Sequence, residues 1–340
     1  MGVILVVGSR HVRGDDLVSG GRFYKQLATP MTLVIDGKPF RETLEQVAAQ
    51  GRVNVWLDRH VDPSAVIAAG QLGPNVFGAL QTVAQQNNCV IMPVANVVLV
   101  GRGDWVDAAA AAIIPVSNSL PREDFDWEQL TTPREVLASV MKTSPEKTLA
   151  LPHDLWPAVK LQGVQSPVVL NLILSQFGRR LDSTTEPNLK RTLPLSSKDK
   201  VTRRYTQDDL FRAALKTLDD PPALRPGNGA VALTMTASEH RELTAAIFAS
   251  AGNKAPKRDL DKGGLELKID DAPAIAVLGQ LAGVAQMKCI VVLAADADSK
   301  KFISLDVKDK SLRELIELVA EQAALKVQWG KEDFTLLPAL

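Results

Sequence analysis

Cysteine is scarce in this sequence. Its 340 residues include two cysteines, Cys89 and Cys289, which lie far apart along the chain. Two isolated cysteines are too few for a disulfide framework or a clustered metal site. Each one begins an apolar run that is typical of a strand, so we expect both to be buried free thiols. The cysteines therefore predict neither a metal nor another cofactor.

An excess of charge of one sign is also missing. Lys and Arg total 39, Asp and Glu total 39, and aromatic residues make up 5% of the chain. Proteins that bind nucleic acids by neutralising phosphates need a basic surface, and no basic stripe with interleaved aromatics is present. The balance of charge therefore argues against a nucleic-acid partner.

Long hydrophobic runs are absent as well. No apolar segment approaches the ~20 residues of a membrane-spanning helix. Residues 3–7 are five consecutive apolar residues, but a secretory signal needs about seven to fifteen, with a basic flank before them and a small-residue cleavage site after them. We therefore identify no convincing signal peptide, although the run is compatible with the remnant of one if the true start lies upstream. A cytoplasmic location stays open.

Catalytic motifs are not recognisable. No glycine-rich phosphate-binding motif follows residues 3–7, and the four histidines show no HxxxH or HExxH spacing. The pair His153-Asp154 has the composition of a base-orienting dyad. No nucleophile accompanies it, so we interpret it as a turn with a structural histidine.

Two further polar groups have simple structural interpretations. Ser238-Glu239-His240 reads as a helix N-terminus, in which Ser238 caps the helix and Glu239 meets its dipole. The EF-hand spacing, with its central glycine and final glutamate, is not met by Asp296, Asp298 and Asp306. We therefore predict no catalytic, cofactor-binding or metal-binding residues and expect a protein that is not an enzyme.

The clearest pattern that is present covers residues 264–340. Helical spacing of apolar residues predicts a helix at 274–286, entered at Pro273, and another that begins after Ser311. Ser311 with Glu314 three residues later forms a capping box. Alternating or β-branched apolar residues predict strands at 265–269, 289–293, 302–308, 325–329 and 334–337. The predicted order is β-α-β-β-α-β-β.

Residues 31–102 repeat this plan. FRETLEQVAAQGRVNVWLD (40–58) matches IAVLGQLAGVAQMKCIVVL (275–293) in its sequence of helix, exit and strand. NVFGALQTVAQQNNCVIMP (75–93), with Asn75 as helix cap, matches SLRELIELVAEQAALKVQW (311–329) in the same way. Two copies of one supersecondary plan indicate a repeat architecture.

Residues 127–197 read as a third, degenerate copy. Thr132 caps its first helix, with Pro133 at the first helical position, and Ser166 caps its second. Gly178 ends the second helix. Short strands are predicted at 148–151, 158–164, 180–183 and 190–195.

The other segments complete the domain plan. Residues 200–252 predict a compact β-α-β-α unit with helices capped by Asp208 and Ser238. Turn-rich or charged composition predicts linkers at 103–126 and 253–263. Residues 1–30 receive no assignment.

The repeated pattern resembles a known domain family. Residues 303–318 with 325–337, and more loosely 31–57 with 77–100, resemble the short N-terminal (STN) domain of secretins and TonB-dependent receptors. ALTMTASEHRELTAAI (232–247) is similar to the ring-building subdomain that follows this domain in secretins. The resemblance implies an α+β fold of tandem small βαββαββ domains, each with two helices packed on small sheets, plus a short βαβα unit.

In those families the module is a periplasmic interaction domain. The resemblance therefore implies a non-enzymatic protein-interaction or scaffolding protein of a bacterial cell envelope, with other envelope or outer-membrane proteins as partners. We see no barrel or plug pattern in the 340 residues, so we do not expect channel or uptake functions to carry over. Two alternatives stay open: an accessory or signalling component of a secretin-type secretion or TonB-dependent uptake system, and an enzyme with an unrecognised site.

Strand edges are the best functional lead. A small sheet covered by two helices leaves edges open, and a partner peptide can add a strand there. We predict such an edge in the last hairpin or in its counterpart at 90–100. The residues predicted for the last hairpin are Leu325, Val327, Trp329, Phe334 and Leu336. We expect mainly packing roles, with one or two partner anchors, for Trp56, Trp105, Trp127, Trp156 and Trp329.

Overall fold

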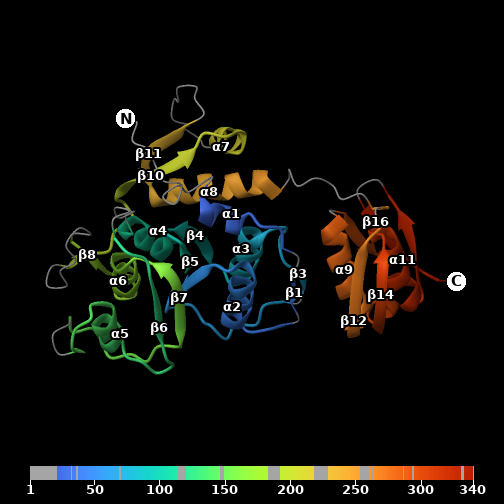
Figure 1. Cartoon of the computed structure of the whole chain (residues 1–340), viewed down its shortest axis with the longest axis horizontal. Helices are drawn as coiled ribbons and strands as arrows, with labels where there is room; N and C mark the ends of the chain where they lie inside the picture. The colour runs from blue at the N-terminus through green and yellow to red at the C-terminus, as the bar shows by residue number, and fades with distance from the viewer. Residues whose placement is uncertain are drawn as a thin grey trace. The chain divides into compact units, whose positions relative to one another are not determined.

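The fold is α+β, as predicted: helices alternate with several small sheets. The computed structural model describes residues 21–340 except 32, 36, 69, 114–119, 146–148, 183–191, 218–228, 253–259, 262, 286, 293–294, 331–332 and 340. Described residues up to 29, 39–65 and 76–252 form unit 1, and residues 30–38, 66–75 and 260–339 form unit 2 (Figure 1). No helix in these ranges has the length and apolar character needed to cross a membrane.

Copy 1, residues 31–102, contains all seven predicted elements. They are β1 (Val34–Ile35), α2 (Phe40–Gly51), β2 (Asn54–Leu57), β3 (Gly70–Gln71), α3 (Val76–Gln86), β4 (Val90–Val94) and β5 (Val97–Gly101). β1 pairs with β3 in an antiparallel ribbon, which belongs to unit 2. In the second sheet β5 is central, parallel to β2 and antiparallel to β4.

Copy 3, residues 264–340, has the same pairing scheme. Its elements are β12 (Leu265–Pro273), α9 (Ala274–Ala285), β13 (Lys288–Val291), the short α10 (Asp296–Ser299), β14 (Phe302–Lys310), α11 (Leu312–Gln322), β15 (Leu325–Trp329) and β16 (Asp333–Pro338). β12 pairs with β14, and β16 lies between parallel β13 and antiparallel β15. α9 and α11 pack on both sheets. The predicted capping box at Ser311 and Glu314 is confirmed.

The degenerate copy predicted at residues 127–197, here called copy 2 from its place along the chain, keeps part of the pairing scheme. It contains β6 (Glu123–Trp127), α5 (Pro133–Val140), β7 (Val159–Val164), α6 (Ser166–Ser175), β8 (Arg179–Leu181) and β9 (Thr192–Pro194), with β6 paired to β7 and β8 to β9. The cap at Thr132 is confirmed and is part of a capping box. The cap at Ser166 is wrong, because Gln165 holds that position and makes no side-chain cap. Residues 149–151 form no strand, and residue 148 lies outside the described residues.

A buried helix occupies the first part of the segment predicted as a linker at 103–126. α4 (Gly103–Ala112) is buried along nearly its whole length. Apart from Asp104 and Asp107 its sequence is apolar and rich in alanine, and a helix with so little polar surface is stable only when other elements surround it. The end of the same segment forms β6, the first strand of copy 2. The composition of a linker was therefore misleading here.

The βαβα unit at 200–252 has the predicted order. It consists of β10 (Lys200–Thr206), α7 (Asp209–Leu215), β11 (Ala230–Thr236) and α8 (Ala237–Gly252). Asp208 caps α7 as predicted. The predicted cap at Ser238 is wrong: the Glu239 N–H donates to the Thr236 hydroxyl, and the Thr236 N–H donates to the Glu239 carboxylate. The helix begins one position after Thr236, so Ser238 lies inside it.

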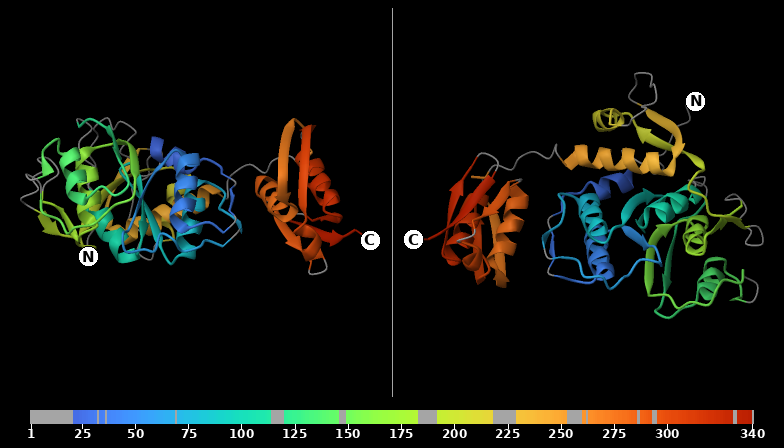
Figure 2. Two further views of the ribbon diagram at one scale, coloured as in Figure 1. Left: turned by 90° about the horizontal axis from the view of Figure 1, so that it is seen from below. Right: turned by 180° about the vertical axis from the view of Figure 1, so that it is seen from behind.

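α8 makes the βαβα unit part of unit 1. Its Phe248 ring stacks on Phe77 of α3, at 4.1 Å between centroids, and on Tyr24 of α1 (Arg22–Leu27), at 4.8 Å. Its Arg241 forms two hydrogen bonds, of 2.8 and 3.1 Å, with the Asp107 carboxylate of α4. Figure 1 and the right view of Figure 2 show α7 and the β10–β11 ribbon on the other side of α8 from α1 and α3.

Charged side chains fix both ends of α4. Arg102, directly before the helix, donates to the buried Asp58 carboxylate at 2.7 Å. Arg203 of β10 donates to the Ala110 carbonyl at 2.8 Å, where the last helical carbonyls lack partners within the helix. A cation at a helix C-terminus is also favoured by the helix dipole. α4 is therefore held by copy 1 at one end and by the βαβα unit at the other.

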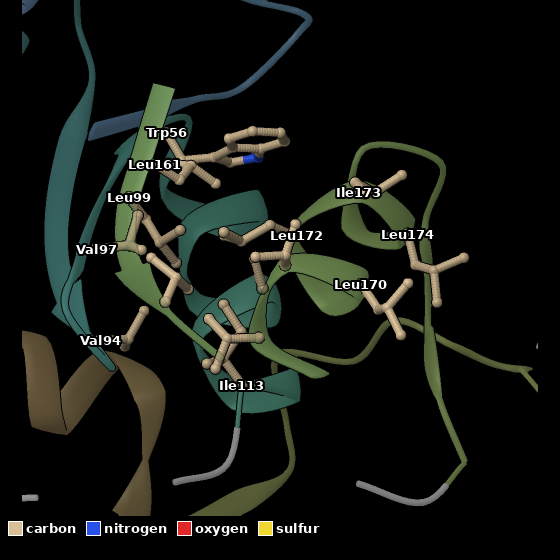
Figure 3. Close-up of a cluster of buried hydrophobic side chains, with 14 of the residues drawn as sticks. Trp56, Val94, Val97, Leu99, Ile113, Leu161, Leu170, Leu172, Ile173 and Leu174 are labelled. Carbon is tan, nitrogen blue, oxygen red and sulfur yellow. The ribbon is translucent and has the colours of Figure 1, made fainter. Parts of the chain in front are cut away.

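A large hydrophobic core of unit 1 lies against the face of the copy 1 sheet that carries Trp56, Val97 and Leu99. Trp56, Val97 and Leu99 project from the sheet toward Leu161 of β7 and Leu172 of α6 (Figure 3). α4 fills the space beside them, and its Trp105 N–H donates to the Ser175 carbonyl of α6 at 3.1 Å. Copies 1 and 2 and α4 consequently share one hydrophobic core.

Candidate functional site

The free edge of β15 exposes main-chain groups. Among the described strands, β15 pairs with β16 alone. The Gly330 N–H donates to the Asp333 carbonyl at 2.8 Å, and the Ala339 N–H donates to the Ala324 carbonyl at 3.0 Å. Since antiparallel pairs alternate, even-numbered residues of β15 bond to β16. The N–H and C=O groups that point away from β16 belong to Leu325, Val327 and Trp329.

The side chains of the predicted edge residues point into the core of copy 3 and not along the open edge. Leu325, Phe334 and Leu336 are buried in the core of copy 3, and Val327 and Trp329 pack against it half-buried. These five side chains are therefore packing residues. The open edge is carried by the backbones of Val327 and Trp329, because Leu325 as a whole residue is buried. The exposed side chains of β15 are Lys326 and Gln328.

Trp329 is held firmly at the end of this edge. The Arg313 guanidinium lies over its ring, 4.4 Å from the centroid, and its indole N–H donates to Glu317 at 2.9 Å. Arg313 also donates to Asp261 at 2.7 Å. Cation–π contact and hydrogen bonds fix the ring against α11, so this end of the edge is preorganised. Glu317 remains exposed beside it.

The counterpart hairpin at 90–100 lies in the interior. Every residue of β5 is buried, as are the last four residues of β4. β4 packs against α3, α4 and α8, and its Pro93 has no N–H to offer. The hypothesis of an open edge at this hairpin is therefore wrong.

Copy 2 covers the other edge of the same sheet. The Asn54 side chain of β2 exchanges two hydrogen bonds with the main chain of Gln162 in β7, at 2.9 and 2.8 Å. The Gln176 side chain accepts from the Arg59 N–H at 2.8 Å and donates to the Leu57 carbonyl at 3.0 Å. These two side-chain amides imitate a strand ladder, so β2 offers no free edge along its length.

Three tryptophans that are far apart in the sequence meet in unit 1. Trp56, Trp127 and Trp156 have ring centroids 5.9 to 6.5 Å apart. Phe177 stacks on Trp156 at 6.1 Å. All three indoles are buried, so their role is packing and the predicted partner anchors are not found among them.

The pair His153-Asp154 is part of a turn. The Asp154 carboxylate accepts from the Leu155 N–H at 3.0 Å and from the Trp156 indole at 3.1 Å. It also pairs with Arg59 at 3.2 Å. His153 is exposed. These contacts give Asp154 a role in fixing the turn against the tryptophan cluster.

His240 is a core residue with both ring nitrogens engaged. Nε2 lies 2.9 Å from the Val201 carbonyl, and Nδ1 lies 2.7 Å from the Tyr205 hydroxyl. A carbonyl only accepts, so Nε2 carries the hydrogen and Tyr205 donates to Nδ1. Burial and the nearby Arg203 charge lower the pKa of His240 to about 4. The imidazole is neutral near pH 7 and has no free nitrogen for base catalysis.

Asp58 and His60 of copy 1 form an acid-base pair that the sequence did not indicate, and Cys89 lies within the electrostatic influence of Asp58. The His60 Nδ1 lies 3.2 Å from the buried Asp58 carboxylate. Burial would raise the pKa of Asp58, but hydrogen bonds from Arg102 and His60 outweigh it and lower this pKa. A Cys nucleophile must be a thiolate, yet burial and the Asp58 charge raise the pKa of Cys89 to about 11. Asp58 serves to anchor α4 through Arg102.

No metal-binding cluster of three or more His, Cys, Asp or Glu side chains occurs among the described residues. Asp298 instead pairs with Lys301 at 2.7 Å. Cys89 and Cys289 are free cysteines, as predicted, but Cys289 is only partly buried. Comparisons of the chain with protein-family models, with curated proteins and with solved structures find no match.

Proposed function

We propose that this chain is a protein-interaction or scaffolding protein of a bacterial cell envelope, built from STN-like repeats, and that copy 3 is its partner-binding module. The partner is an extended segment of another envelope protein, which adds a strand to β15. Unit 1 serves as the rigid support. The proposal places the protein in the periplasm or envelope.

The shared strand pairing supports the repeat part of the proposal. Copies 1 and 3 have a three-stranded sheet with one parallel and one antiparallel pair, and each adds a two-stranded ribbon. Two independent segments that reach the same mixed sheet indicate one duplicated module.

The functional part of the proposal rests on the open edge of β15. In strand addition, main-chain hydrogen bonds supply affinity and alternate side chains supply specificity. The outward backbone of Val327 and Trp329 supplies the first. Glu317 and Lys326, on opposite sides of the edge strand, supply the second. They favour a partner strand whose residues toward α11 are basic and whose opposite residues are polar or acidic.

Proline at position 327 tests the proposal. Val327→Pro removes one outward N–H and leaves the β15–β16 ladder intact, because Val327 makes no ladder bond. Val327→Ala is the matched control, since it shortens the side chain similarly and keeps the N–H. We expect in-cell crosslinking and mass spectrometry of the tagged chain to identify an envelope partner that is retained by Val327→Ala and lost, at least tenfold, by Val327→Pro.

Two results would contradict the proposal. Equal partner recovery with both variants would show that the β15 edge is not used. Recovery of cytoplasmic partners alone, together with fractionation of the protein into the cytoplasm, would remove the envelope assignment. Circular dichroism of the two purified variants checks that both are folded.

A further inference from the structure

The β10–β11 ribbon presents a second unpaired edge, which does not depend on the proposed function. The ribbon is regular over its full seven residues, with Lys200 opposite Thr236 and Thr206 opposite Ala230. The Gln207 N–H donates to the Gly229 carbonyl at 2.9 Å, which sets the alternation of the ladder. Residues of β11 whose main-chain groups turn away from β10 are therefore Ala230, Ala232, Thr234 and Thr236.

Thr236 gives independent evidence for this alternation. Its N–H donates to Glu239 in the capping box at 2.7 Å and so cannot belong to the β10 ladder. Ala232 and Thr234, two and four residues earlier, have the same orientation. Among the described strands, β11 pairs with β10 alone.

The β11 edge lacks the features that normally prevent strand addition. Natural proteins protect edges with charged residues, proline or bulges. β11 reads AVALTMT, with no charge, no proline and no register shift. β10, in contrast, carries exposed Lys200 and Arg204 on the same ribbon. The two edges of one ribbon are therefore unequal, and only the β11 edge is unprotected.

We propose that β11 pairs in antiparallel fashion with β11 of a second copy of this chain, around a twofold axis at Leu233. Ala232 then lies opposite Thr234 of the second copy, and Ala230 lies opposite its Thr236. The Ala232–Thr234 pairs join residues with outward main-chain groups, so the alternation of both strands is satisfied at the centre of the contact. At its ends the Thr236 N–H is already held by Glu239 and forms no bond across the contact. An isologous contact of this kind closes a dimer.

The side chains suit this partner better than a foreign strand. Val231, Leu233 and Met235 are buried on the inner face, and the outer face of β11 carries only alanine and threonine. Threonine pairs with its neighbours across a sheet, as the Thr202 and Thr234 hydroxyls do at 2.7 Å in the ribbon. Pairing through β10 would instead bring Lys200 and Arg204 of two copies together, which like-charge repulsion opposes.

Paired proline variants of the full chain test the proposal. Ala232→Pro removes an outward N–H at the β11 edge and keeps the β10 ladder. Arg204→Pro makes the same change at the opposite residue, on the β10 edge. By light scattering after size exclusion, we expect the unaltered chain and Arg204→Pro to have about twice the 36.7 kDa chain mass and Ala232→Pro to have the single-chain mass.

Thr234→Lys provides a second test if Ala232→Pro does not fold. The lysine places like charges on the facing strands, and we expect a monomer with an unchanged circular dichroism spectrum. Thr202→Lys, on the opposite residue of β10, is its control and should remain dimeric. A monomeric unaltered chain, or a dimer that persists in Thr234→Lys, would overturn the proposal. Loss of the dimer in Arg204→Pro alone would assign the contact to β10 and also overturn it.

Discussion

The three-stranded sheets of copies 1 and 3 differ in how far one of their two faces is buried. This face carries Leu99 in copy 1 and Thr335 in copy 3. When the two sheets are aligned by the register of their strand pairs, Leu99 takes the same position as Thr335. In the same alignment of the two sheets, Met92 corresponds to Gln328 and Trp56 corresponds to Ile290. The copy 1 residues are all buried, whereas Ile290 is 42% exposed and Gln328 is exposed. One strand-pairing scheme thus yields a sheet covered on both faces and a sheet open on one.

This difference is visible in the sequence pattern. VIMPV and VVLVG of copy 1 are continuous apolar runs, which are typical of strands buried on both faces. LKVQW of copy 3 alternates, which is typical of a strand with one solvent face. The pattern therefore indicates which of the two sheets has a solvent-exposed face, although the pairing scheme does not.

The largest expected effect tests the two faces at one equivalent position. Met92→Gln buries an amide with no available partner, and we expect a loss of about 2–4 kcal/mol in the free energy of unfolding of unit 1. Gln328→Met is the reverse change at the open face and should alter stability by less than about 0.5 kcal/mol. Urea unfolding followed by tryptophan fluorescence and circular dichroism measures both. Similar losses in the two variants would contradict the comparison.

A pH effect of somewhat smaller size should arise from His240 in unit 1, and no histidine occurs in unit 2. The folded pKa of His240 is about 4, against 6.5 for an unperturbed histidine. The unfolded chain therefore binds the proton first as the pH falls. This contribution is fully present above pH 6.5 and is lost between pH 6.5 and 4, by up to about 3 kcal/mol.

Unfolding free energies measured across pH 4–7 check the size of this loss. His240→Gln serves as the control, since an amide can donate to Val201 and accept from Tyr205 without titrating. We expect this variant to remove most of the slope of unit 1. An unchanged slope would assign the pH dependence to other groups.

The smallest expected effect concerns helix capping in the open copy. Ser311→Ala removes the acceptor of the Glu314 N–H and should destabilise unit 2 by about 1 kcal/mol. Ser311→Thr keeps the hydroxyl and should restore most of the loss. Thr132→Ala provides the equivalent change in covered copy 2. Thermal unfolding by circular dichroism distinguishes the two units if their transitions separate, and a Ser311→Thr loss equal to that of alanine would argue against the capping role.

Local signals were predicted well from the sequence, because the atoms that decide them lie within a few residues. The capping box at Ser311, the caps at Thr132 and Asp208 and the order of elements in copies 1 and 3 are of this kind. The cap at Ser238 was wrong by two positions, because Thr236 ends a strand and begins a helix at once. The match of 40–58 to 275–293 is one residue out of register, since α2 starts at Phe40 and α9 at Ala274.

Features that depend on distant partners were not predictable from one sequence. The burial of α4 follows from Asp58, Ser175, Arg203 and Arg241, which come from four separate segments. The sequence predicted an edge in the last hairpin or in its counterpart at 90–100, but it did not show which groups of Leu325, Val327 and Trp329 face outward. Only the ladder alternation shows that their backbones, and not their side chains, face outward.

The attachment of α4 at both ends determines how the protein can be divided for expression. A fragment that ends before Arg102 would leave the buried Asp58 carboxylate without that partner, and one that ends near residue 199 would remove Arg203 and Arg241 from the helix. Removing one partner of a buried ion pair is strongly destabilising. A cut after Gly252 breaks none of these α4 contacts, but it divides unit 2, because residues 30–38 and 66–75 belong with 260–339. Truncation at Gly252 therefore spares α4, whereas cuts in the earlier turn-rich segments do not.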